Sequence, residues 1–238
     1  MKASLLAMGA SLATLSACAQ AEPTAPENPQ LSEPVVIMVS SEEEKQQIFA
    51  AIYQVAFEDE GRDAVVIDDD RDDEGANKHL ESRANLMVGC TGALLNYYAP
   101  QKAQAVSEEY VESQEDPTGE DYLAKTHVEL MSVMDPAYSV VEPAGSAKGC
   151  EDAEPELPQN FVATYEKVAL DREERQMLTG LTKFVTDQDL KEIQEEVEGG
   201  EDLFTAVRAW YEPSDAAQKV NEQSDDDSSG GSQLSDDD

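Results

Sequence analysis

Short apolar runs and amphipathic segments alternate along the first half of the chain. Residues 35–39 read VVIMV, a continuous and mostly β-branched run that is typical of a buried strand. Residues 64–67 and 86–88 form two further short apolar runs. We therefore expect three strands, with an acidic loop over residues 68–74 and a short helix around Leu80 between the last two.

A helix is predicted between the first two of these strands. Apolar residues such as Ile48 and Ile52 recur at helical spacing, and Gly61 follows as a C-terminal stop. Ser41 and Glu44 have the spacing of a capping box, so we expect their side chains to close the helix N-terminus. Strands that alternate with helices in this way predict a parallel α/β sheet.

The second half of the chain adds helices and two short strands. Thr91 opens a helix, and residues 122–134 form another. Residues 139–141 and 161–168 have strand patterns on either side of a loop at residues 142–158. Three amphipathic helices then close the domain, and their inward-facing residues are Met177, Leu178, Leu181 and Phe184, then Leu190, Ile193 and Val197, then Leu203, Val207 and Trp210.

The N-terminus has the three parts of a secretory signal. Met1 and Lys2 form a basic start, residues 3–15 are small and apolar, and small residues precede Cys18. Leu15-Ser16-Ala17-Cys18 resembles a bacterial lipobox, in which the thiol takes a diacylglycerol before cleavage. We expect residues 1–17 to be removed and lipid on Cys18 to anchor the chain outside the cytoplasm, at the bacterial cell membrane. The alternative is an ordinary signal peptide with a chance cysteine.

Composition separates two flanking segments from the domain, which we place at residues 35–213. Residues 18–34 are rich in Pro, Glu and Ala and predict an extended linker, while residues 214–238 predict a disordered acidic tail. Over the whole chain, 16 Lys and Arg face 52 Asp and Glu, which gives a net charge of −36. Such a charge repels nucleic acid, so we expect no nucleic-acid partner.

The cysteines suggest a disulfide. If Cys18 carries lipid, Cys90 and Cys150 are the two thiols that remain in an exported chain. Disulfides persist outside the cytoplasm, and the count is even, so we expect a Cys90–Cys150 bond. The alternative is two buried free thiols.

The sequence lacks the usual patterns of catalytic and metal sites. The stretch 68–74 fails the calcium-loop pattern, because Asp73 and His79 stand where that loop has its glycine and its last glutamate. His79 and His127 are the only histidines, and neither has a partner at zinc spacing. There is no phosphate-binding Gly-rich loop, no Gly-x-Ser-x-Gly elbow, and no histidine near Cys90 in sequence. We expect no enzyme activity, no cofactor and no metal.

Three segments carry a family resemblance. Residues 35–67 contain, in order, a strand, a Ser-containing loop, a helix that ends in Gly and a second strand. In residues 76–98, a Thr-Gly pair follows a third strand. In residues 156–212, a closing strand is followed by a Thr-Asp pair at the start of a helix and then by a late helix. In this order they resemble substrate-binding proteins of ABC transporters for glycine betaine, choline and related osmoprotectants. The resemblance implies an α/β, type II periplasmic-binding-protein-like fold with a parallel-rich sheet flanked by helices.

The chain departs from that family in two ways. The matched segments build the first of two lobes, and residues 99–156 are too short for a second, so we expect mainly one lobe, with the second reduced or absent. The family commonly has an acid and an aromatic before Thr-Gly, and the aromatic contributes to a cage for a quaternary ammonium. Gly89 and Cys90 stand there in this chain. Tyr97 and Tyr98 could supply an aromatic wall instead, although core packing is the alternative.

Candidate ligand-binding residues follow two strands. Ser40 and Ser41 come after the first strand, and Thr91 and Gly92 come after the third. Open α/β sheets bind ligands at the carboxyl ends of their strands, and a helix N-terminus favours polar or anionic groups. Each of these residues could instead serve as a helix cap.

The resemblance implies an extracytoplasmic solute-binding lipoprotein. It would deliver or sense a small solute such as a quaternary amine, with an ABC permease as its membrane partner. The alternative is a lipid-anchored interaction or scaffold protein that reuses the fold without small-molecule transport. The reduced cleft and the lost aromatic favour this alternative.

Overall fold

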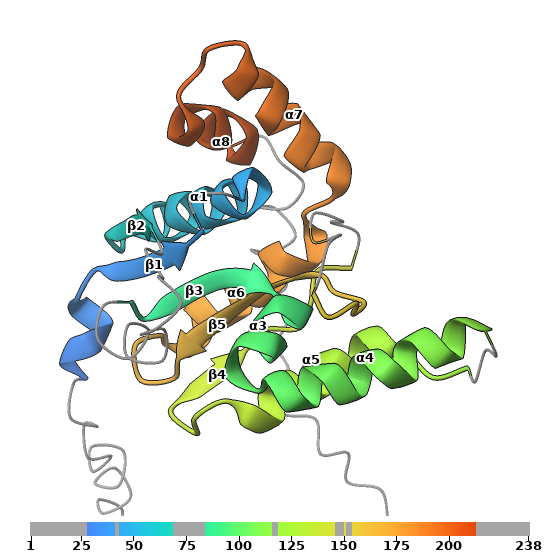
Figure 1. Ribbon diagram of the computed structural model, residues 1–238. Coiled ribbons are helices and arrows are strands. Elements are labelled where there is room, and N and C mark those ends of the chain that lie inside the picture. Colours follow the sequence, from blue (N-terminus) through green and yellow to red (C-terminus); the bar gives the residue numbers. More distant parts are fainter. Residues whose placement is uncertain are drawn as a thin grey trace, which may run out of the picture.

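The computed structural model describes residues 28–40, 43–68, 84–115, 119–145, 150 and 154–212 (Figure 1). The strands are β1 (Val35–Val39), β2 (Ala64–Asp68), β3 (Leu86–Cys90), β4 (Tyr138–Val140) and β5 (Phe161–Glu166). The helices are η1 (Pro29–Ser32), α1 (Glu44–Asp59), α3 (Thr91–Tyr98), α4 (Pro100–Glu115), α5 (Tyr122–Val133), α6 (Arg172–Phe184), α7 (Asp187–Glu198) and α8 (Leu203–Tyr211).

The five strands form one mixed sheet in the order β2-β1-β3-β5-β4. β1 pairs with β2 and β3 in parallel, whereas β5 runs antiparallel to both of its neighbours, β3 and β4. The predicted α/β sheet flanked by helices is confirmed. The predicted parallel arrangement of the first three strands is also confirmed, since β1 pairs with β2 and β3 in parallel. β5 runs the other way, because the chain re-enters the sheet from the edge at which β3 and β4 end.

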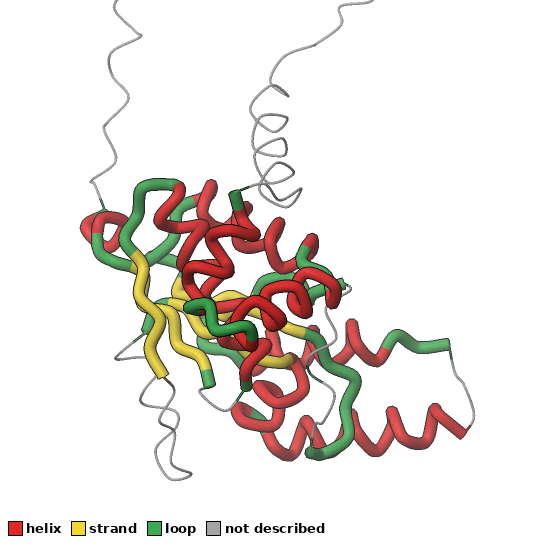
Figure 2. The backbone as a smooth tube through the Cα atoms, turned by 90° about the horizontal axis from the view of Figure 1, so that it is seen from above, coloured by secondary structure: helices red, strands yellow, loops and turns green. Residues whose placement is uncertain are grey.

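Alternating side chains along the strands build two apolar layers, as the strand pleat requires. Val35, Ile37 and Val39 belong to a core shared with α1, α6, α7 and α8. Met38 and the partly buried Val36 belong to a second core shared with α3, α4 and α5. The sheet is therefore covered by helices on both faces, and the α4–α5 hairpin extends beyond the strands (Figures 1 and 2).

Helix α1 shows how packing can set the position of a helix. Its N-cap is Glu43, which makes no capping hydrogen bond from its side chain, so the predicted capping box of Ser41 and Glu44 is wrong; Ser41 lies outside the described residues. Much of the helix is buried, from Ile48 to Phe57, and this burial holds it in place without a cap. The predicted stop is confirmed: Gly61 follows the helix with φ +84°, which suits glycine.

Residues 28–34, which the sequence assigns to the linker, are held against the domain. The Asn28 side chain donates to the Val168 carbonyl at 2.6 Å. The Arg62 guanidinium donates to the carbonyls of Gln30 and Glu33, and it pairs with Glu174 at 2.6 Å. One arginine thus joins the N-terminal segment to α6.

Several predicted features lie outside the described residues. These are the signal segment 1–17, the lipidation site Cys18, the helix around Leu80 and the tail 214–238. In the part of the chain that the structure describes, no helix is both long and apolar enough to cross a membrane.

Candidate functional site

The candidate ligand-binding residues predicted from the sequence follow strands that end at one edge of the sheet, the carboxyl edge. β1, β2, β3 and β4 run in one direction and end at this edge, and β5 begins there. Open α/β sheets bind their ligands at such an edge. The C-terminal end of β3, with Cys90 and Thr91, lies in the middle of it.

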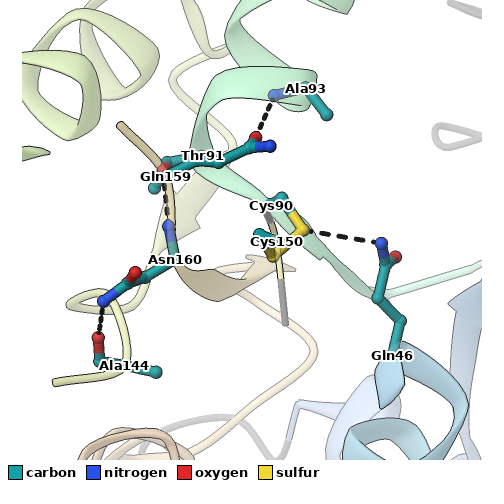
Figure 3. Close-up of a disulfide and its surroundings, with 8 residues drawn as sticks. All are labelled: Gln46, Cys90, Thr91, Ala93, Ala144, Cys150, Gln159 and Asn160. Carbon is teal, nitrogen blue, oxygen red and sulfur yellow. Dashed lines mark hydrogen bonds between the residues drawn. A yellow bond between two sulfur atoms is a disulfide. The ribbon is translucent and has the colours of Figure 1, made fainter. Parts of the chain in front are cut away.

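A disulfide joins β3 to the chain that returns toward β5. Cys90 and Cys150 are bonded, as the sequence predicts, with their Cα atoms 5.9 Å apart. Both side chains are buried in the core beneath α1. The Gln46 amide of α1 donates to the Cys90 Sγ at 3.5 Å (Figure 3). Cys90, at which the resemblance predicts an aromatic residue, is therefore part of a covalent link.

Thr91 pairs with the returning chain through both of its polar groups. Its backbone N–H donates to the Asn160 carbonyl at 3.1 Å, and its hydroxyl oxygen accepts from the Asn160 N–H at 3.2 Å. The side chain is fully buried. Thr91 thus links the start of α3 to the chain segment at Asn160, and its hydroxyl is not exposed to solvent.

Gln159 occupies the N-terminus of α3. Its side-chain oxygen accepts from the Ala93 N–H at 3.0 Å, so it takes the place that an anion or polar ligand would take at a helix N-terminus (Figure 3). A Cβ added to Gly92 would lie 2.8 Å from the same oxygen and 3.1 Å from the Leu157 Cβ. Gly92 therefore permits a close approach of the protein's own chain.

The returning chain is itself fixed to the edge of the sheet. The Asn160 side-chain amide donates to the Ala144 carbonyl, and the Ala144 N–H donates to the Phe161 carbonyl at 2.9 Å. The Val141 N–H donates to the Ala163 carbonyl at 2.9 Å, which extends the pairing of β4 and β5. Together with the disulfide, these bonds hold Gln159 and Asn160 in place.

The other predicted site residues have separate positions. Ser40 follows β1 and is partly buried, and Ser41 lies outside the described residues. The rings of Tyr97 and Tyr98 meet edge to face, with centroids 4.9 Å apart, and Tyr98 packs against the core beneath α3. Cys90, Thr91 and Gly92, which are consecutive in sequence, thus all contact the chain that returns toward β5.

No pattern in the sequence singles out Gln159 and Asn160. Their side chains act through a helix N-terminus and a carbonyl that are distant in sequence. A Gln-Asn pair before a strand has no recognisable motif, so the sequence contains no signal that would have found them.

The described ranges hold titratable groups outside this edge as well. No group of three or more His, Cys, Asp or Glu side chains there is placed to hold a metal ion. Burial lowers the pKa of His127 on α5 below its ordinary value, against smaller opposing effects from a backbone hydrogen bond with Val141 and from the charge of Glu142. His127 lies beside the chain that continues β4.

Comparison with family models, with curated proteins and with solved structures gives no match to this chain.

Proposed function

We propose that this chain is a lipid-anchored extracytoplasmic protein that reuses one lobe of a type II binding fold as an interaction or scaffold module. The signal segment and Cys18 support the anchor. The occupied N-terminus of α3 supports a role other than solute capture and carries the proposal.

The path of the chain supports the one-lobe interpretation. A two-lobed protein must lead its chain out of the first lobe and back again. Here the chain leaves after β4 and returns into β5 at the same edge, through residues 141–160 alone. A domain needs about 50 residues or more, so this connection is far too short to form a second lobe.

The Gln159 side chain at the N-terminus of α3 supports the inference that this protein does not capture a solute there. A ligand at this position would have to displace the Gln159 side chain from the Ala93 N–H and separate Thr91 from Asn160. The Cys90–Cys150 bond opposes that movement, because it ties the returning chain to β3. The same bond stands where the family resemblance expects an aromatic.

Solute binding in the manner of the osmoprotectant family is the second candidate. The common edge of four strand ends favours it, since ligands bind there in open α/β sheets. An ABC permease would then be the partner, and a quaternary amine such as glycine betaine the solute.

Calorimetry separates the two candidates. The full chain without its signal segment is titrated with glycine betaine, choline, carnitine and proline betaine. We expect no saturable heat up to millimolar concentrations. Saturable binding of any of the four would support transport, and its response to Gln159→Ala, with the exposed Gln188→Ala as control, would show whether the α3 N-terminus is the site.

The anchor is tested in a bacterial host. The unaltered chain should fractionate with membranes and carry a mass increment of lipid, and Cys18→Ser should release it from the membrane fraction. A Cys18→Ser protein that stays in the membrane fraction would contradict the anchor. Cross-linking on intact cells then tests the partner: an ABC permease would favour transport, and another envelope protein would favour the interaction role.

A further inference from the structure

A groove runs along α6, on a part of the molecule distinct from the Thr91–Gln159 contact. Its volume is about 380 Å³. That volume lies within the range of small-molecule sites, which span about 300–1,000 Å³. The described residues that line it are Glu142, Arg172, Arg175, Gln176, Thr179, Gly180 and Lys183.

Three cationic side chains line this groove. Arg172, Arg175 and Lys183 all come from α6, and the first and last are separated by about 16 Å of helix at a rise of about 1.5 Å per residue. Arg175 is held by a bond from its Nε to the Asp171 carbonyl at 2.8 Å. The groove is therefore elongated, with positive charge along its length.

This concentration of positive charge is unusual for the chain. Lys and Arg number only 16 against 52 acidic residues. Ion pairs occupy many of the described cations, such as Arg62 with Glu174, Lys102 with Glu129, Lys125 with Glu109, Lys191 with Glu195, and Arg208 with Glu58. Arg175 and Lys183 form no ion pair with any residue that the structure describes.

We propose that the α6 groove binds a small organic dicarboxylate. Guanidinium groups match carboxylates in two-point geometry, and an ammonium supplies a second, flexible point of attachment. The net charge of −36 repels anions at long range, so a ligand must engage more than one cation to bind. Two separated carboxylates fit an elongated groove better than one compact anion does.

Glu142 lies on the groove and opposes the ligand. Its carboxylate comes from the chain that follows β4, and the other lining residues that the structure describes come from α6. A bound dicarboxylate would face this charge, so Glu142 limits the affinity of the site. Its neutralisation is therefore expected to strengthen binding.

The test compares glutarate, a dicarboxylate, with acetate, which has one carboxylate. Backbone amide shifts of α6 and calorimetry are followed during titration of the full chain without its signal segment. We expect glutarate to bind saturably with a Kd below about 1 mM, and acetate to bind at least about tenfold more weakly.

Matched variants locate the site. Arg172→Gln/Lys183→Gln removes two exposed cations and should weaken glutarate binding about tenfold or more. Lys45→Gln/Lys191→Gln makes the same change in net charge elsewhere and should alter the Kd less than about twofold. Arg175→Lys keeps the positive charge but loses the two-point geometry of the guanidinium, so it should also weaken glutarate binding. Glu142→Gln should strengthen glutarate binding.

Three results would overturn the proposal. They are the absence of saturable glutarate binding, equal affinity for acetate, and equal losses in the two double variants. None of them bears on the anchor or on the α3 N-terminus, so this site and the proposed function can fail separately.

Discussion

Gly92 is the residue at which the filling of the α3 N-terminus by Gln159 can be tested most directly. Gly92→Ala places a Cβ 2.8 Å from the Gln159 oxygen, and neighbouring atoms of the returning chain must shift. We expect the free energy of unfolding to fall by about 1–3 kcal/mol, as overpacking in a filled site does. Urea denaturation measures this loss.

Two further variants control that experiment. A Cβ at Gly145 would meet no described atom within 4 Å, so Gly145→Ala should change stability by less than about 0.5 kcal/mol. Gly92→Ala combined with Gln159→Ala should cost less than the sum of the single changes, because the clashing oxygen is gone. Strict additivity would show that Gln159 does not fill this position.

His127 should make stability depend on pH in a known direction. Burial lowers its pKa in the folded chain, while an unfolded histidine titrates near 6.5. Below that pH the unfolded chain binds the proton more readily, so stability should fall as the pH drops from about 7 toward 5. His127→Gln should flatten this dependence relative to His79→Gln, as followed by urea unfolding at each pH. Equal slopes in the two variants would contradict the assignment.

At the scale of elements, the disulfide fastens β3 to the chain that returns into β5. It closes a loop with a sequence separation of 60 residues. Cross-linking a loop of that length lowers the entropy of the unfolded chain, which corresponds to about 4 kcal/mol of stability. Cys90→Ser/Cys150→Ser should lose most of that amount in urea denaturation.

Reduction offers an independent control for the disulfide. A reductant should destabilise the unaltered chain and leave the double variant unchanged. Hydrogen exchange should accelerate at the amides of Ala93 and Asn160 in the variant, since Gln159 and Asn160 lose their tether. If protection of these amides persists, the hydrogen bonds alone keep the helix N-terminus closed.

The sequence predicted elements with strong apolar periodicity and missed those determined by contacts distant in sequence. β1, β3 and α1 were found because buried faces repeat at strand or helix spacing. Helix α4 was not, because only a narrow stripe of it, including Ala103 and Val106, is buried and the rest is polar.

The direction of β5 and the occupied helix N-terminus could not be predicted for a related reason. A strand pattern is the same whether the strand runs parallel or antiparallel to its neighbours, so residues 161–166 gave no sign of their reversal. Gln159 fills its position only because that reversal brings the returning chain beside α3. The cysteine pair was predicted, because counting thiols needs no knowledge of topology.

For the whole molecule, charge is the dominant feature. A net charge of −36 produces self-repulsion in the compact state that the unfolded chain partly relieves. Raising NaCl from about 10 mM to about 1 M shortens the Debye length from about 30 Å to about 3 Å. We expect the Tm to rise with salt, by about 2–4 °C for each kcal/mol gained.

The salt effect is measured by thermal unfolding. Tetramethylammonium chloride should act like NaCl if screening is the cause, whereas a gain seen only with NaCl would indicate a specific sodium effect. A Tm that falls with salt would mean that ion pairs such as Arg62–Glu174 outweigh the repulsion.

The position of β5 also has a consequence for the order in which the chain is made. β5 is the last of the described strands in sequence order, yet it lies between β3 and β4 in the sheet. A growing chain therefore completes β1, β2 and β3 long before the strand that covers β3 exists. Every residue of β3 is buried in the finished protein, so a partial chain exposes an apolar strand edge that can recruit other chains. Fragments that end before residue 161 should aggregate, and the domain should fold only after nearly all of it has been synthesised.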